Sequence, residues 1–480
     1  MKKFLLGSVA LIALSTAANA ADLAARYTKA PPIAPVSNWT GFYAFGGFGY
    51  GLMEADQHST TGGVVSSLDT RMGGRGYFGT VGLGYDYQLT PAWVVGVFGD
   101  AQWGDIRGSL IDLNNGFSGR LKNDASYSVG GRIGYLVAPN VLSYVNAGYS
   151  YGQFKGATFS DGVTVTAIDK SHRDGWFIGG GVENDLNFFG INAPGWFMKT
   201  EYRVTEYDRK NSFYTDGSGN GIAFKPYVQT VSTALVYRFN SHVTSGATVG
   251  SPFYTKAAPA SAYNWTGFYL AGGGGYGLFS ADQHTVTGGV NGVDTRSGGR
   301  GYFGTVGGGY DWQLNPSWVV GIFGDAQFGD ISGSLADAAN GVTGRMKNDT
   351  NYAAGARLGY LISPNALSYV NVGYSHADFK GATLVDNTGT VVGSTGKSHR
   401  DGWFLGGGVE NSLNIFGISS PGWFMKTEYR VAEYNRKTSD IVDPTGVSTG
   451  TGIAFKPYVQ TIQTSLVYRF NWGSPVVAKY

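Results

Sequence analysis

Charged side chains that could carry chemistry occur in this chain as two matching sets. Charges removed from water must be paired, so in a narrow enclosed space these residues would form a network of ion pairs. Along a wide pore, the same residues would instead set the charge selectivity. We favour the ion-pair network, and the choice depends on the elements that hold the residues. The two sets are Asp100, Arg132, Glu183, Lys199, Glu201, Arg203 and Arg238, and Asp325, Arg357, Glu410, Lys426, Glu428, Arg430 and Arg469.

Three short motifs contain residue types used in catalysis or ligand binding, and each occurs twice. A carboxylate two residues from an imidazole in a loop supplies too few ligands for a metal site. Adjacent serine, histidine and aspartate cannot adopt the geometry of a catalytic triad. Glycine runs inside predicted strands do not indicate phosphate binding. We therefore expect no enzyme activity, no cofactor and no metal site. The motifs are Asp56-Gln57-His58, Ser171-His172-Arg173-Asp174 and Gly179-Gly180-Gly181, with counterparts Asp282-Gln283-His284, Ser398-His399-Arg400-Asp401 and Gly406-Gly407-Gly408.

The matching sets arise from a long internal duplication. Residues 38–240 recur, with modest changes, at residues 264–471. A period of about 200 residues is too long for a solenoid unit. We therefore predict two equivalent domains, repeat 1 (38–240) and repeat 2 (264–471), joined by a linker at 241–263. Residues 21–37 are predicted to form a periplasmic leader and residues 472–480 a C-terminal tail.

The N-terminus and the composition predict an exported β protein. Two lysines, a short apolar run and the cleavage site Ala18-Asn19-Ala20 indicate a secretory signal peptide at residues 1–20. No later apolar run approaches the roughly 20 residues of a spanning helix, so any membrane crossing must use strands. Glycine accounts for 77 of 480 residues and aromatic residues for 15%, as is typical of strands and turns. A net charge of +2 without a basic stripe predicts no nucleic-acid partner, and the lack of cysteine excludes disulfides.

Repeat 1 divides into eight stretches, each longer than the roughly 9 to 11 residues that a tilted membrane strand needs. Tight turns containing proline or glycine alternate with long polar loops, and all three length changes between the repeats fall in those loops. Short turns on one side and long loops on the other are typical of an outer-membrane β-barrel. The predicted strands are 40–54, 74–89, 93–107, 122–138, 141–156, 174–189, 195–208 and 225–239, with the same pattern in repeat 2.

Alternation along the strands indicates their two faces. In the fifth predicted strand, Val145, Ala147 and Tyr149 lie on one side and small or polar residues lie between them. By the period-2 rule, the apolar side would face lipid and the small or polar side would face the lumen. Tryptophans near the strand ends are expected at the two headgroup levels. They are Trp93, Trp103, Trp176, Trp196, Trp318, Trp403 and Trp423.

Several motifs carry a resemblance to a known family. They are Ala21-Asp22-Leu23, the Tyr27-to-Pro31 segment, the strand entry Trp39-Thr40-Gly41-Phe42-Tyr43 and an aromatic-ended last strand. In these features the chain resembles the eight-stranded outer-membrane β-barrel proteins of alphaproteobacteria, surface antigens often grouped as the porin family, and more distantly the OmpA transmembrane domain. The resemblance covers nearly the whole mature chain, twice over, and implies no particular activity.

The last strand of each repeat also resembles the signal read by barrel-assembly machinery, with alternate apolar or aromatic residues ending in phenylalanine. Family members usually end at that phenylalanine, whereas residues 471–480 follow it here, so the segment that is read stays open. The signal residues are Val231, Leu235, Tyr237 and Phe239 in repeat 1, and Ile462, Leu466, Tyr468 and Phe470 in repeat 2.

The fold class is therefore an all-β transmembrane antiparallel barrel, either two tandem eight-stranded barrels or one sixteen-stranded barrel. Eight strands enclose an interior just filled by side chains, whereas sixteen leave an aqueous channel. We favour two barrels, because the linker repeats the leader motif as Tyr254-Thr255-Lys256-Ala257 and is longer than a periplasmic turn.

We expect an integral outer-membrane protein with extracellular loops and both termini in the periplasm. Its predicted role is that of a structural surface antigen of the cell envelope. The alternatives are a passive porin for small hydrophilic solutes and, third, an outer-membrane enzyme. The expected partners are outer-membrane lipid and lipopolysaccharide, and the barrel-assembly machinery during biogenesis. The sequence does not predict an oligomeric state.

Overall fold

A computed structural model of the chain describes residues 38–138, 140–186, 191, 193–239, 264–413, 418 and 420–470. The predicted signal peptide, leader, linker and tail lie outside these residues. The described residues form antiparallel strands, which confirms the predicted all-β class. Among them, no helix has the length and apolar character needed to cross a bilayer.

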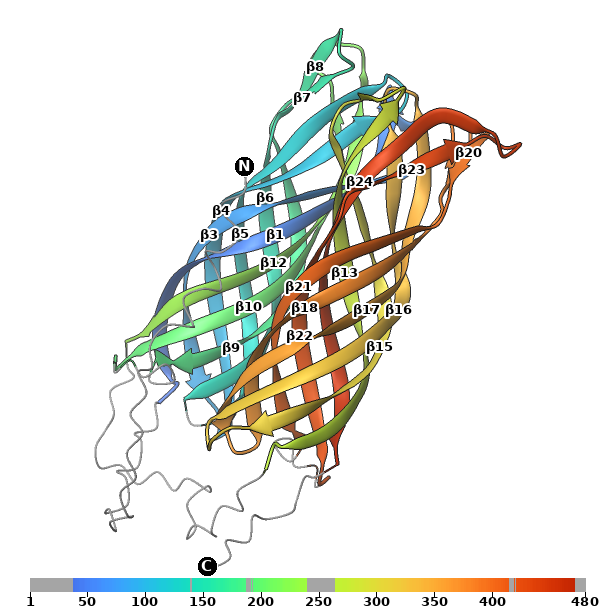
Figure 1. Cartoon of the computed structure of the whole chain (residues 1–480). Coiled ribbons are helices and arrows are strands. Elements are labelled where there is room, and N and C mark those ends of the chain that lie inside the picture. The colour runs from blue at the N-terminus through green and yellow to red at the C-terminus, as the bar shows by residue number, and fades with distance from the viewer. Residues whose placement is uncertain are drawn as a thin grey trace, which may run out of the picture. The chain divides into compact units, whose positions relative to one another are not determined.

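Repeat 1 forms a ring of eight long strands, each hydrogen-bonded to two neighbours. β1 pairs with β3 on one side and with β12 on the other, so the ladder returns to its first strand. These strands run from blue to green in Figure 1. In ring order they are β1 (Gly41–Thr61), β3 (Thr70–Gln88), β4 (Trp93–Asp112), β5 (Phe117–Ala138), β6 (Val141–Lys155), β9 (Ser171–Asp185), β10 (Trp196–Tyr207) and β12 (Asn220–Arg238).

Repeat 2 closes in the same way, because β13 pairs with both β15 and β24. The pairing therefore follows the arrangement of two eight-stranded rings rather than one ring of sixteen. In ring order the strands are β13 (Gly267–Thr287), β15 (Thr295–Gln313), β16 (Trp318–Asp337), β17 (Val342–Ser363), β18 (Ala366–Lys380), β21 (Ser398–Ser412), β22 (Trp423–Tyr434) and β24 (Ser448–Arg469).

The strands extend well beyond the predicted bounds at the ends opposite the tight turns. The segments predicted as the long loops 55–73 and 108–121 are largely strand, and short strands occupy parts of 157–173 and 209–224. The prediction was wrong there because outward positions of these extensions, such as Arg120, carry polar side chains, while apolar side chains such as Leu110 and Phe159 are buried inside the ring. The apolar-outside alternation therefore fades while backbone pairing continues. The short strands are β2 (Val64–Val65), β7 (Ala157–Ser160), β8 (Val165–Ile168), β11 (Lys210–Phe213), β14 (Val290–Asn291), β19 (Thr383–Val385), β20 (Val391–Thr395) and β23 (Lys437–Val442).

The two faces of the strands follow the predicted alternation. In β6, Val145 and Tyr149 are exposed on the outside, whereas Asn146 and Ser150 are buried inside. The interior, however, also holds large aromatic side chains, such as Phe177, which is fully buried. The lumen is therefore not lined by small and polar residues alone, as the alternation suggested, because aromatic rings occupy the space that the interior glycines leave.

Reciprocal ion pairs connect the two repeats near their loop-side ends. Arg75 of repeat 1 contacts Asp282 of repeat 2 at 2.6 Å, and Arg300 of repeat 2 contacts Asp56 of repeat 1 at 2.6 Å. Arg75 and Arg300 are equivalent positions, as are Asp56 and Asp282. The same surface of each repeat therefore supplies both partners, as in an isologous interface.

Candidate functional site: ion-pair networks inside the two rings

The structure places all fourteen charged residues of the two predicted sets on the inner faces of the strands. Thirteen of them are buried, with Glu183 and Glu410 fully so, and the Asp325 side chain is 9% exposed. A charge removed from water requires a partner, and each of these residues has one. In each repeat the residues separate into two layers.

The first layer is a closed circuit of alternating charges across the lumen of repeat 1. Asp86, Arg132, Glu183 and Arg238 come from β3, β5, β9 and β12, which are every second strand of the ring. Arg132 Nε donates to Asp86 at 2.9 Å, and its Nη1 donates to Glu183 at 3.1 Å. Arg238 contacts the same two carboxylates, Asp86 at 2.8 Å and Glu183 at 2.7 Å. Two guanidinium groups thus neutralise two carboxylates within one cross-section of the ring.

The second layer joins opposite walls of the same ring. Arg203 of β10 donates to both carboxylate oxygens of Asp100 of β4, at 3.1 and 2.7 Å. It also donates to Glu201 at 2.8 Å. Glu201 accepts further hydrogen bonds from the Tyr144 hydroxyl and the Asn146 amide of β6, both at 2.9 Å.

Repeat 2 reproduces both layers. Arg357 donates to Asp311 at 2.8 Å and to Glu410 at 3.1 Å, and Arg469 contacts Glu410 at 2.7 Å and Asp311 at 2.8 Å. In its second layer, Arg430 donates to the two oxygens of Asp325 at 3.0 and 2.6 Å. The two copies of the network therefore have the same arrangement of ion pairs.

Aromatic rings pack against the cations and occupy the space that remains. The Arg132 guanidinium lies 4.4 Å from the Tyr43 ring centroid, and that of Arg238 lies 4.1 Å from the Trp39 ring centroid. The Lys199 ammonium lies 3.4 Å from the Phe45 centroid. Such contacts favour a cation removed from water. Charged and aromatic side chains together thus cross the lumen and leave the networks shielded from solvent.

Sequence reasoning missed Asp86 and its counterpart Asp311, which complete the first layer. The alternation along β3 could have revealed Asp86, because this residue shares the inward face with Gly82 and Gly84. Asp86 is fully buried and is shared between two arginines. Without it, the predicted residues of this layer would carry one more positive than negative charge.

The Asp56-Gln57-His58 motif lies within β1 and not in a loop as expected. Asp56 Oδ1 accepts a hydrogen bond from Arg71 Nε at 2.6 Å, and His58 Nδ1 contacts Asp69 at 2.8 Å. The buried Gln57 amide donates to Thr70 at 3.1 Å. Each member of the motif thus has its own neighbours, and the structure does not bring Asp56 and His58 together as paired ligands.

The Ser171-His172-Arg173-Asp174 motif forms the start of β9, where successive side chains point to opposite faces. His172 stacks on Tyr151 with ring centroids 5.5 Å apart, and Asp174 accepts a hydrogen bond from the Tyr149 hydroxyl at 2.5 Å. Arg173 points inward over Phe224.

The glycine run Gly179-Gly180-Gly181 lies inside the same strand, where there is little room for side chains. A Cβ at Gly181 would be 2.4 Å from the Thr200 carbonyl oxygen.

The predicted assembly residues lie on the outward face of the last strand of each ring. Leu235 and Phe239 are 50% and 52% exposed, and Leu466 and Phe470 are 51% and 55% exposed. The Val231, Tyr237, Ile462 and Tyr468 side chains share this face.

All seven tryptophans that were expected near strand ends have exposed side chains.

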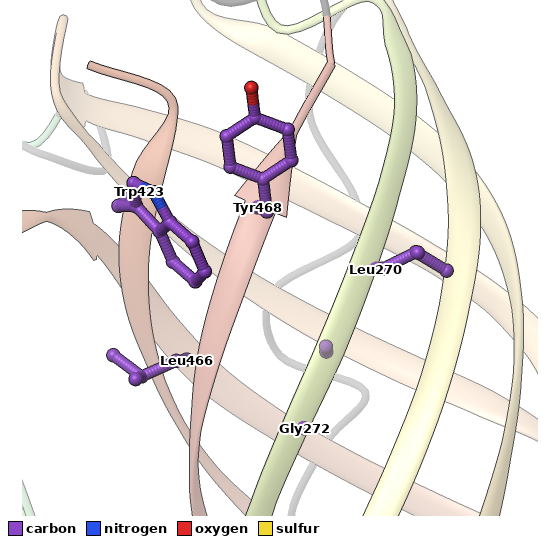
Figure 2. A pocket seen from close by; sticks show the side chains of 6 residues that line it. Leu270, Gly272, Trp423, Leu466 and Tyr468 are labelled. Carbon is purple, nitrogen blue, oxygen red and sulfur yellow. The ribbon is translucent and has the colours of Figure 1, made fainter. Parts of the chain in front are cut away.

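A shallow apolar groove lies on the outer surface of repeat 2 (Figure 2). Leu270, Trp423, Leu466 and Tyr468 line it, from the neighbouring strands β13, β24 and β22. These side chains point away from the lumen, so the groove is separate from the ion-pair networks.

Comparison with known proteins identifies one family. The model of the outer membrane protein beta-barrel domain matches residues 7–239 and again residues 253–470. The 31 kDa outer-membrane immunogenic proteins of Brucella melitensis biotype 1 and Brucella suis biovar 1 are each 31% identical over 254 residues, which cover 50% of this chain and 100% of the relative. The 25 kDa outer-membrane immunogenic protein of Brucella canis is 29% identical over 244 residues, covering 50% of this chain and 99% of the relative.

Two solved structures show weaker similarity. A Pseudomonas aeruginosa FadL homologue is 11% identical, with 90% of each chain covered and a TM-score of 0.27. The attachment invasion locus protein of Yersinia pestis, Ail, is 13% identical, with 41% of this chain and 99% of that chain covered and a TM-score of 0.19. Similarity at this level carries no functional information.

Proposed function

Because the chain belongs to the outer membrane protein beta-barrel domain family, we propose that it is a structural surface protein whose two barrels do not conduct solutes. In this proposal the barrels anchor the chain in the outer membrane and present their loop-side ends outside the cell. The observation that carries it is the circuit of alternating charges, Asp86, Arg132, Glu183 and Arg238, which crosses the lumen of repeat 1 and recurs in repeat 2.

Several physical arguments support non-conducting barrels. An eight-stranded barrel has an interior just wide enough for its own side chains. A solute crossing this lumen would have to separate arginines from carboxylates that are buried, and breaking one buried pair costs about 3 to 5 kcal/mol. The passive porin, which remains the alternative, requires a wider ring than the observed pairing supports.

The names of the relatives support a role at the cell surface, since the Brucella proteins are called outer-membrane immunogenic proteins. We extend that role to this chain, with the loop-side strand extensions as the exposed antigenic region. An outer-membrane enzyme, the third alternative, finds less support, because neither copy of the Ser-His-Arg-Asp motif pairs its own histidine and aspartate. In repeat 1, His172 and Asp174 contact separate tyrosines, and in repeat 2, His399 contacts Asp378 instead of Asp401.

The proposed partners follow from the same placement. Exposed aromatic side chains on the outer faces would contact membrane lipid, and basic rim residues such as Lys155, half-exposed at 49%, would contact lipopolysaccharide phosphates. The outward-facing last strands would be read by the barrel-assembly machinery during insertion. Both termini are placed in the periplasm in this proposal.

The decisive test of the non-conducting state is electrical. Full-length signal-cleaved protein, refolded in detergent and inserted into planar lipid bilayers, is expected to give no stepwise conductance under conditions in which a sixteen-stranded porin conducts. Flotation of the protein with lipid vesicles and its heat-modifiable migration in gels show that it has inserted and folded. Stable conductance steps from the unmodified protein would overturn the proposal and favour the porin.

The surface orientation can be tested with single cysteines, since the natural chain has none. Val163, in the turn between β7 and β8, is 93% exposed, and Pro91 is exposed in the tight turn between β3 and β4. A membrane-impermeant maleimide is expected to label V163C on intact cells and to label P91C only after permeabilisation. The reverse pattern would contradict the proposed orientation.

A further inference from the structure

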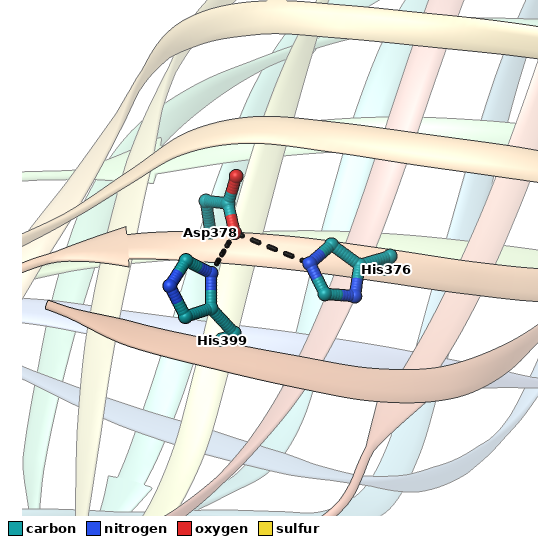
Figure 3. Close-up of side chains that lie close together, drawn as sticks. All are labelled: His376, Asp378 and His399. Carbon is teal, nitrogen blue, oxygen red and sulfur yellow. Dashed lines mark hydrogen bonds and ion pairs between the residues drawn. The ribbon is translucent and has the colours of Figure 1, made fainter.

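We propose that the outer face of repeat 2 carries a binding site for a divalent transition-metal ion, formed by His376, Asp378 and His399 (Figure 3). One ligand atom from each residue, an imidazole nitrogen or a carboxylate oxygen, lies within 4.8 Å of the other two. The site is separate from the interior networks, because its side chains point outward.

Strand geometry brings the three residues together. His376 and Asp378 are two residues apart in β18, so both point to the outer face. His399 lies directly opposite Asp378 in the neighbouring strand β21, and Asp401 lies opposite His376. Tyr374 and Trp403 form the next cross-strand pair toward the tight-turn side, and both are exposed. The histidines therefore lie one step beyond an outward-facing aromatic pair, at the water-facing edge.

The distances suit one small ion. The Asp378 Oδ1 atom lies 2.5 Å from His399 Nδ1 and 3.3 Å from His376 Nε2. Zinc–ligand distances of about 2.0 to 2.2 Å in a tetrahedral site place neighbouring ligand atoms about 3.3 Å apart. Small rotations of the exposed His399 ring would bring its nitrogen to this spacing.

A second carboxylate orients the first histidine. His376 Nδ1 lies 2.8 Å from Asp401 Oδ1, and the Tyr374 hydroxyl donates to the same oxygen at 2.5 Å. With a proton on Nδ1 directed at Asp401, the unprotonated Nε2 faces Asp378. Metal-binding histidines commonly use such a carboxylate to fix the ring and its tautomer.

The donor types indicate the class of ion. Two imidazoles with one carboxylate suit Zn²⁺, Cu²⁺ or Ni²⁺, whereas Mg²⁺ and Ca²⁺ prefer oxygen ligands alone. The His399 side chain is 63% exposed and that of His376 is 30% exposed, so the site is open to water for the remaining coordination position.

Repeat 1 supplies a natural control within the same chain. Its residues at the corresponding positions are Tyr151 and Gln153, in place of His376 and Asp378, while His172 and Asp174 correspond to His399 and Asp401. Tyr151 stacks on His172 instead of offering a second imidazole. Within the part of the chain that the structure describes, the proposal therefore assigns one metal ion, in repeat 2.

The test is zinc binding by the full-length signal-cleaved protein, refolded in detergent and carrying no histidine tag. Isothermal titration with ZnCl₂ is expected to show one site per chain. The variant H376Y/D378Q, which gives repeat 2 the residues that repeat 1 already accommodates, is expected to lose it. The reciprocal Y151H/Q153D variant is expected to bind two ions, and D401N to bind about 10-fold more weakly.

Heat-modifiable migration in gels checks that each variant is folded, so loss of zinc binding cannot be confused with loss of structure. No zinc binding by the unmodified protein would overturn the proposal. Binding that is unchanged in folded H376Y/D378Q would overturn it as well, since the two histidines and Asp378 would then form only local ion pairs.

Discussion

Arg203 and Asp100 join opposite walls of the first ring through two parallel hydrogen bonds of 3.1 and 2.7 Å. Their strands, β10 and β4, are four positions apart in a ring of eight, and the residues are 103 positions apart in the chain. Both side chains are buried. A bidentate pair in this position fixes the distance across the lumen as well as neutralising the charges.

Replacing Arg203 with methionine is expected to destabilise repeat 1 by about 3 to 5 kcal/mol, because Asp100 and Glu201 would stay buried without their arginine. Urea unfolding of the refolded protein in lipid vesicles, followed by tryptophan fluorescence, measures the change. The double variant D100N/R203M is expected to lose less stability than the two single variants combined. As a control, the exposed Lys155→Met should change stability by no more than about 0.5 kcal/mol. Equal effects of R203M and K155M would contradict the role of the pair.

The alternation of apolar and small residues was sufficient to predict the strands and their faces within the membrane region. Val145 and Asn146 lie outside and inside as expected. The strand ends could not be predicted equally well, since Thr60 and Thr61 lie in a paired extension whose side chains do not alternate in polarity. There the ladder is maintained by backbone hydrogen bonds, which leave no side-chain pattern.

Gly148 in β6 allows the close approach of β5. A Cβ at this position would lie 2.2 Å from the Val129 carbonyl oxygen and 2.6 Å from the Gly130 Cα. We expect Gly148→Ala to destabilise repeat 1 by about 1 to 3 kcal/mol through overpacking. The matched control is Gly131→Ala, whose nearest contact would be 3.7 Å away. The same urea titration compares the two, and a loss of stability in G131A as large as in G148A would refute this explanation.

Residues 21–240 alone are expected to fold into a heat-modifiable barrel, since β12 pairs with β1 and completes a ring without any strand of repeat 2. Migration of boiled and unboiled samples in gels, with circular dichroism, is the measurement. Residues 21–190 serve as the negative control, because they lack β10 and β12 and cannot close the ring. A fragment 21–240 that stays unfolded while the full chain folds would show that the repeats depend on each other.

The interior charges could be proposed from residue type and strand phase, but their grouping into two layers could not. Arg132 and Arg238 are 106 residues apart in the chain and share the same two carboxylates only because the ring brings β5 and β12 to the same depth. The proposed metal-binding residues escaped sequence reasoning for a related reason: His376 and His399 are separated by 23 residues and meet through cross-strand register. Neither relationship is local in sequence.

The reciprocal pairs Arg75–Asp282 and Arg300–Asp56 predict that the repeats remain associated when the chain between them is cut. A protease site introduced into residues 241–263 would allow cleavage after folding in a mild detergent, and size-exclusion chromatography would then show whether the halves elute together. We expect the natural surface to hold them and the variant R75A/R300A to weaken their association, so that a larger fraction of the halves elutes separately, because partly buried charge pairs contribute about 1 kcal/mol each and these two act in one interface. The control variant is K122A/K347A, which changes one equivalent lysine in each repeat. Lys122 and Lys347 pair with Asp124 and Asp349 of their own repeats, so their loss should leave the association unchanged. Separation of the halves with both arginines present would contradict the interface.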